Sequence, residues 1–92
     1  MPLTQRVTFK AMLQKKNLIQ VPKLIRWKYK LEPTETMKIT VNLVESMGLR
    51  ENFIGNMHKD GRILIPKIQR ALLRGGEPSI EGYIFEVTLE PT

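Results

Sequence analysis

The segment KDGRILIPKIQR, residues 59–70, carries the strongest structural signals in the chain, and KKNLIQVPKLIR, residues 15–26, is a second copy of it. Each copy opens with a tight turn, at Gly61 in one and at Asn17 in the other. Glycine accepts a positive φ at no steric cost, and asparagine is the next most tolerant residue there. A short apolar run and a proline follow, and proline suits the first turn of a helix. The segment therefore predicts a turn, a strand and a helix in that order, twice.

The likeness extends over nearly the whole chain. At the same offset of 44 positions Phe9 falls on Phe53, and with two inserted residues the segment 39–43 falls on 85–89. Apolar, β-rich residues precede each turn, and a second such stretch follows each predicted helix. Each half of the chain is therefore one repeat, a strand–strand–helix–strand unit. The expected strands are 7–13, 18–21, 37–44, 53–57, 62–65 and 83–89. The expected single domain spans 1–92, with internal repeats at about 5–45 and 50–91.

The segment 23–31 fits two periodicities. Its apolar residues alternate with basic ones, as in a strand, but Leu24, Trp27 and Leu31 also form one stripe of a helix. The second copy favours the helix, because it ends on a glycine pair, a common helix stop. We therefore expect a helix with this stripe buried and Trp27 in the core. The corresponding stripe of the second helix is Ile68, Ala71 and Leu72.

Six short strands and two helices in 92 residues predict a mainly β domain. Strands that close around a shared axis leave no free edge, which favours a barrel over an open sheet. We therefore expect a six-stranded, pseudo-twofold barrel built from the two strand–strand–helix–strand repeats.

The motif DGRILIPKIQR, residues 60–70, resembles the signature of the AbrB-type swapped-hairpin transcription factors. In that family one strand–strand–helix–strand unit forms half a barrel, and two chains complete it as a dimer. A chain with two units looks like a fused, single-chain relative, similar to the cradle-loop barrels and to small uncharacterised archaeal RIFT-barrel proteins among them. The resemblance implies a cradle-loop barrel and DNA binding.

The net charge of +6 is concentrated in one half of the chain. Residues 1–46 hold nine Lys and Arg against three Glu, whereas residues 47–92 hold six basic and six acidic residues. A basic half is the electrostatic footprint of a nucleic-acid binder, although a solvated surface has the same composition.

Both predicted helices carry basic residues at i, i+3 and i+7, on one face. Such a stripe suits contacts with phosphates, and it also suits the solvent side of any half-buried helix. The lysine-rich first turn is a second basic site, and by the resemblance Arg62, Lys67 and Arg70 match motif positions that lie near DNA in the AbrB family. The predicted nucleic-acid-binding residues are Lys15, Lys16, Lys23, Arg26, Lys30, Arg62, Lys67, Arg70 and Arg74. Among the aromatic residues between these cations, Tyr29 is the candidate for stacking on bases.

Signals for enzyme chemistry are scarce. The chain has no cysteine and one histidine, His58, which excludes thiolate catalysis and a typical zinc site. It has no phosphate-binding glycine motif, no nucleophile elbow and no apolar run of membrane-spanning length, and residues 1–10 lack the apolar region of a signal peptide. We therefore expect no catalytic residue, cofactor, metal or membrane contact, and a cytoplasmic protein.

Two functions remain open at this point. The first is a nucleic-acid-binding protein, with DNA favoured, that holds the phosphate backbone and acts in transcription or chromosome organisation. The alternative is a small-ligand barrel for a nucleotide or a flavin, which the cradle-loop resemblance implies through an archaeal riboflavin kinase. A third is a protein-interaction module that uses the acidic C-terminal stretch.

The repeat predicts a monomer, because one chain supplies both half-barrels. Sedimentation at micromolar concentration should give the mass of one chain, 10.7 kDa. An obligate dimer would contradict the interpretation of the repeat as a fused pair.

Overall fold

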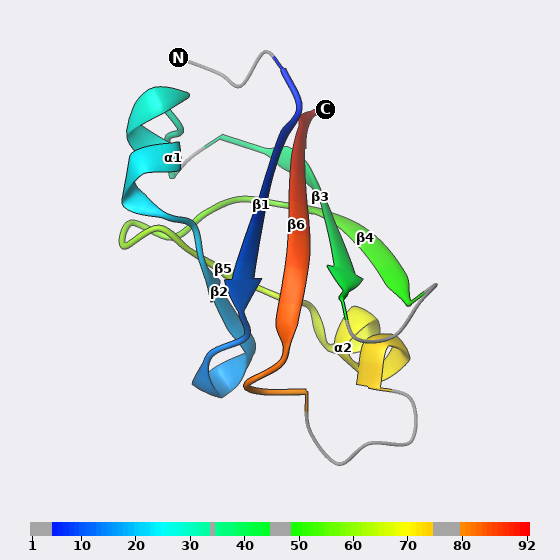
Figure 1. Ribbon diagram of the computed structural model, residues 1–92. Helices are drawn as coiled ribbons and strands as arrows, with labels where there is room; N and C mark the ends of the chain where they lie inside the picture. Colours follow the sequence, from blue (N-terminus) through cyan, green and yellow to red (C-terminus); the bar gives the residue numbers. More distant parts are fainter. Residues whose placement is uncertain (1–4, 34, 45–48, 75–79) are drawn as a thin grey trace.

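The described residues form six strands and two helices, in the order that the repeat predicts, with one added 3-10 turn. Figure 1 shows their arrangement. The computed structural model describes residues 5–33, 35–44, 49–74 and 80–92, and for Arg74 only the backbone. The elements are β1 (Val7–Met12), η1 (Lys15–Asn17), β2 (Leu18–Gln20), α1 (Lys23–Lys28), β3 (Met37–Leu43), β4 (Arg50–Gly55), β5 (Arg62–Leu64), α2 (Lys67–Arg74) and β6 (Ile84–Pro91). The mainly β class is therefore confirmed. The predicted stop at Gly75 and Gly76 lies outside the described residues.

The strands form two antiparallel sheets. One has four strands in the order β1-β6-β3-β4, and the other is a ribbon of β2 and β5. Exchanging the two halves of the chain leaves both orders unchanged, because β1 takes the place of β4, β2 that of β5, and β3 that of β6. The strands at the centre pair with their own counterparts, so Val41 lies opposite Val87 and Ile19 opposite Ile63.

The edge strands depart from this exchange by two residues. Phe9 of β1 lies opposite Val87, whereas Phe53 of β4 lies opposite Ile39 and not Val41. A slip of two residues keeps each side chain on its own face of the sheet, because the side-chain period of a strand is two. The pairing also begins β4 at Arg50, three residues before the predicted start, since backbone pairing with β3 continues into a polar segment.

The core lies between the four-stranded sheet and the ribbon. Alternate residues of the central strands are buried, as in β3, where Met37, Ile39, Val41 and Leu43 point inward. Every buried side chain among the described residues is apolar. The intervening residues of the strands form the outer face of the sheet, which is polar for most of its area.

The predicted burial of the helix stripes is wrong except at Leu31. Leu24 and Trp27 of α1 are 74% and 79% exposed, and Ile68 and Leu72 of α2 are 71% and 53% exposed. Because α1 ends at Lys28, the buried Leu31 lies beyond the helix and cannot share a helical stripe with Trp27. The inner side of α1 is formed instead by residues that pack against the core, Ile25 and Tyr29.

No helix in the described ranges is both long enough and apolar enough to span a membrane.

The ribbon is expected to be essential for stability. Ile63 is 1% exposed at the centre of β5, so Ile63→Ala should lower the free energy of unfolding by about 2–5 kcal/mol. The exposed Ile68 is the matched control, and Ile68→Ala should change it by less than about 0.5 kcal/mol. Urea denaturation followed by circular dichroism measures both. Equal losses in the two variants would contradict this account of the core.

Candidate functional site

Each hairpin turn lies at the base of the helix from the other half of the chain. The backbone N–H of Val21 donates to the carbonyl of Gly61 at 2.9 Å, and that of Ile65 donates to the carbonyl of Asn17 at 3.2 Å. These contacts arise because β2 and β5 are antiparallel, so the end of each strand lies beside the start of the other. Val21 and Ile65 stand two residues before α1 and α2.

The predicted basic residues are thereby divided between two places. The α1 corner combines α1 and its C-terminal turn with the turn before β5, and the α2 corner combines α2 with η1. The α1 corner holds Lys23, Arg26, Lys30 and Arg62. The α2 corner holds Lys15, Lys16, Lys67 and Arg70, and the side chain of Arg74 lies outside the described part of the chain.

The α1 corner is held together by polar contacts across the two halves. The Gln20 carboxamide donates to the Asp60 carbonyl at 3.0 Å and accepts from Arg62 Nε at 3.2 Å. Arg62 also forms an ion pair with the Asp60 carboxylate at 3.5 Å. The guanidinium of Arg26 lies directly over Gly61, where a Cβ would come within 2.5 Å of Arg26 Cζ. A side chain at position 61 would therefore push this guanidinium aside.

The two corners share an unusual feature. Arg26 and Arg70 stand 44 positions apart, at equivalent places in the repeat, and each is half-buried. In both, Nε is buried and has no hydrogen-bond partner. Buried polar atoms normally have a partner, so water or a bound group would satisfy these two.

In the α2 corner, Glu81 accepts a hydrogen bond from the backbone N–H of Lys16 at 2.8 Å.

Two of the predicted lysines have left-handed backbones. Lys16 has a φ of 65° and Lys30 a φ of 54°, and this region costs a residue with a Cβ about 1–2 kcal/mol. Lys30 and Leu31 close α1 with a Schellman turn, in which their N–H groups donate to the carbonyls of Trp27 and Arg26 at 3.3 and 3.0 Å. Glycine usually takes the position of Lys30 in such a turn, and it adopts a positive φ more easily than lysine does at position 16 as well. Both turns therefore keep a lysine at a cost in stability.

Trp27 lies in a shallow hollow on the outside of the α1 corner. The hollow measures about 480 Å³ and is lined by Leu24, Trp27, Lys28 and Lys30. Tyr29, the predicted stacking residue, is half-buried against the core, and Lys28 Nζ lies 5.4 Å from the centre of its ring. The exposed aromatic ring of this segment is therefore that of Trp27.

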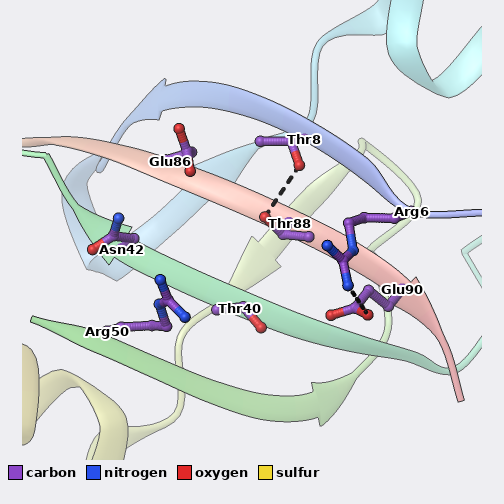
Figure 2. A pocket seen from close by; sticks show the side chains of 8 residues that line it. All are labelled: Arg6, Thr8, Thr40, Asn42, Arg50, Glu86, Thr88 and Glu90. Carbon is purple, nitrogen blue, oxygen red and sulfur yellow. Dashed lines mark hydrogen bonds and ion pairs between the residues drawn. The ribbon is translucent and has the colours of Figure 1, made fainter. Parts of the chain in front are cut away.

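A second hollow lies on the outer face of the four-stranded sheet (Figure 2). It measures about 280 Å³ and draws on all four strands and on the residue before β1. Thr8, Thr88 and Thr40 form a row across β1, β6 and β3, and the hydroxyls of Thr8 and Thr88 share a hydrogen bond of 3.2 Å. Beside this row, Arg6 pairs with Glu90 at 3.3 Å.

Sequence patterns do not reveal this hollow. Strand alternation predicts that its residues face outward, but it does not show that four distant segments bring them together. Figure 2 shows Arg50 from β4, Asn42 from β3 and Glu86 from β6 side by side at one end of the hollow, with Arg6 and Glu90 at the other end. The described residues include no group of three metal-ligating side chains, and His58 is exposed.

The chain is similar in fold to a solved structure. The solution structure of PHS018 from Pyrococcus horikoshii superposes with a TM-score of 0.76 over 91% of this chain and 88% of that chain, at 21% sequence identity. No protein-family model matches the sequence. No curated protein sequence matches it either. The likeness to PHS018 therefore concerns the fold and carries no functional assignment.

The contact between Arg26 and Gly61 leads to a stability prediction. Gly61 and Gly82 have φ values of 84° and 89°, so alanine at either should cost about 1–2 kcal/mol of backbone strain. Only at Gly61 would the new Cβ displace a neighbour, so Gly61→Ala should cost more than Gly82→Ala. That difference should vanish when Arg26→Ala is added, in the same urea titration. An unchanged difference would mean that the guanidinium does not occupy this space.

Proposed function

We propose that this protein binds nucleic acid, with DNA favoured, by contacts between phosphates and the two basic corners. The supporting observation is that strand pairing gathers cations from segments far apart in the sequence. At one corner Arg26 of α1 lies over Gly61, next to Arg62. At the other, the hydrogen bond between Ile65 and Asn17 places the end of η1, which holds Lys15 and Lys16, beside the segment that leads into α2 with Lys67 and Arg70. Contacts of this kind fix a protein on the nucleic-acid backbone without reading sequence.

The equivalent arginines and the strained lysines support the same proposal. Phosphate is an acceptor that a guanidinium binds well, and Arg26 and Arg70 both retain unused donor capacity. Strained backbone positions cluster at functional sites, and Lys16 and Lys30 keep their side chains where glycine would be more stable.

The proposal extends to the fold family. The unchanged strand orders on exchanging the halves support the interpretation of the chain as a pseudo-twofold cradle-loop barrel, similar to a fused AbrB-like pair. A role in transcription or chromosome organisation goes with that resemblance.

The alternative function, a small-ligand barrel, receives its support from the hollow on the sheet. At about 280 Å³ this hollow is slightly smaller than the usual ligand pocket. Its lining residues are threonines, an asparagine, arginines and glutamates, with no aliphatic or aromatic wall for a flavin or a nucleobase. The hollow suits a small polar ligand and not the nucleotide or flavin of the alternative function. The observations therefore favour the nucleic-acid function.

The proposal is tested by oligonucleotide binding at two salt concentrations. A random-sequence duplex and a single strand should both bind at about 50 mM salt. If the protein contacts six or more phosphates, raising the salt concentration to about 200 mM should weaken binding roughly a thousandfold. The combined variant Lys15→Ala, Lys16→Ala, Lys23→Ala and Arg26→Ala should lose most of this affinity. Fluorescence anisotropy of a labelled oligonucleotide measures each case.

The control removes charge from the outer face of the sheet. The variant Arg6→Ala, Lys10→Ala and Lys38→Ala should bind nearly as well as the wild type, because Lys10 and Lys38 face outward on β1 and β3 and Arg6 precedes β1, outside the helices and turns of both corners. Equal losses in the two variants would mean that net charge, and not the corners, attracts the oligonucleotide. Absence of binding at the low salt concentration would refute the proposed function.

A further inference from the structure

Trp27 is the most exposed large apolar side chain among the described residues. It is 79% exposed, in a protein whose small size makes every apolar residue valuable to the core. Leu24 beside it is 74% exposed. Leaving a large aromatic side chain in water forfeits the free energy that its burial would contribute. Clustered exposed apolar residues of this type commonly mark an interaction surface.

The geometry of α1 forces Trp27 outward. Successive residues of a helix are rotated by about 100°. Trp27 is two residues from both Ile25 and Tyr29, so it points to nearly the opposite side of the helix from them. Those two side chains pack against the core. The Schellman turn at Lys30 then ends the helix and sends the chain to the buried Leu31. The tryptophan is therefore held on the outer side of a helix whose inner side is fixed.

The surroundings of Trp27 select an anionic partner. Lys28 and Lys30 line the same hollow as the indole and Leu24, and Lys23 begins the same helix. Single-stranded nucleic acids bind to this combination, because a base stacks on the aromatic ring while cations hold the adjoining phosphates. In a duplex the bases are already stacked on each other, so this contact is available only to a single-stranded segment.

We propose that Trp27 is a stacking site for one base of a single-stranded nucleic acid, with Lys28 and Lys30 at the flanking phosphates. This inference rests on the proposed function and names the form of nucleic acid that the α1 corner takes. The α2 corner lacks the site, because Ala71 and Leu72 stand where α1 has Trp27 and Lys28. The two corners therefore differ in function, with phosphate contacts at both and base contact at one.

The single tryptophan of the chain makes the inference directly measurable. Titration with an oligothymidylate of about 15 nucleotides should quench the Trp27 emission, because a stacked base quenches indole fluorescence. Trp27→Ala should weaken binding about 5- to 150-fold, as expected for loss of one stacked base, and Trp27→Phe should retain much of the affinity. Anisotropy of a labelled oligothymidylate measures the variants, and their urea midpoints should match the wild type because the side chain is exposed. Ile68→Ala, an equally exposed site on α2, should bind like the wild type.

An oligonucleotide of abasic sites keeps the phosphates and removes the bases, so it separates the two proposals. Weaker binding of the abasic strand without quenching supports the stacking site. Equal binding and equal quenching by the abasic strand, or by polyglutamate, would overturn the stacking site. The stacking site would also be overturned if Trp27→Ala had no effect on binding of the single strand. If the duplex still bound in a salt-sensitive way, the proposed function would stand. Absence of binding by every oligonucleotide would overturn both.

Discussion

The antiparallel pairing of β2 with β5 is the contact on which the rest of the molecule depends. These strands have only three residues each, yet the pair joins the two halves of the chain at Ile19 and Ile63, both fully buried. The same pairing brings the turn of each half to the helix of the other, where the Gly61 carbonyl meets the backbone of Val21. If the ribbon were displaced, both the core and the two basic corners would lose their geometry together.

A small core explains the unusual faces of the helices. The inward residues of β1, β3 and β6, with those of the ribbon, already fill the space under the sheet. Neither helix can add a full apolar stripe there, so α1 contributes Ile25 and Tyr29 and α2 contributes Leu73. The remaining apolar side chains of both helices stay outside. At Trp27 this outcome places an aromatic ring among lysines, which is the arrangement that the proposed stacking uses.

The two corners are alike at one position and differ at others. Arg26 and Arg70 stand 44 positions apart and have the same unpartnered Nε, as the proposed interpretation of the chain as a repeat expects. Glycine stands at position 61 where the other turn has Asn17, and Trp27 faces solvent where the other helix has Ala71. Since each corner is assembled from both halves, a change in either half alters both the helix of one corner and the turn of the other.

The sequence by itself determined the order of the elements and the places where the chain turns. Gly61 and Asn17 both have the positive φ that the repeat predicts, and both helices follow their prolines. These features are local, because they depend on the steric limits of single residues and on short apolar runs. Only the tertiary structure decided which side of α1 is buried, because six helical residues are too few for periodicity to settle a face. It also decided that Arg26 covers Gly61 and that residues of four strands meet in the hollow on the sheet. Those contacts follow from strand register between distant segments, which no local pattern encodes.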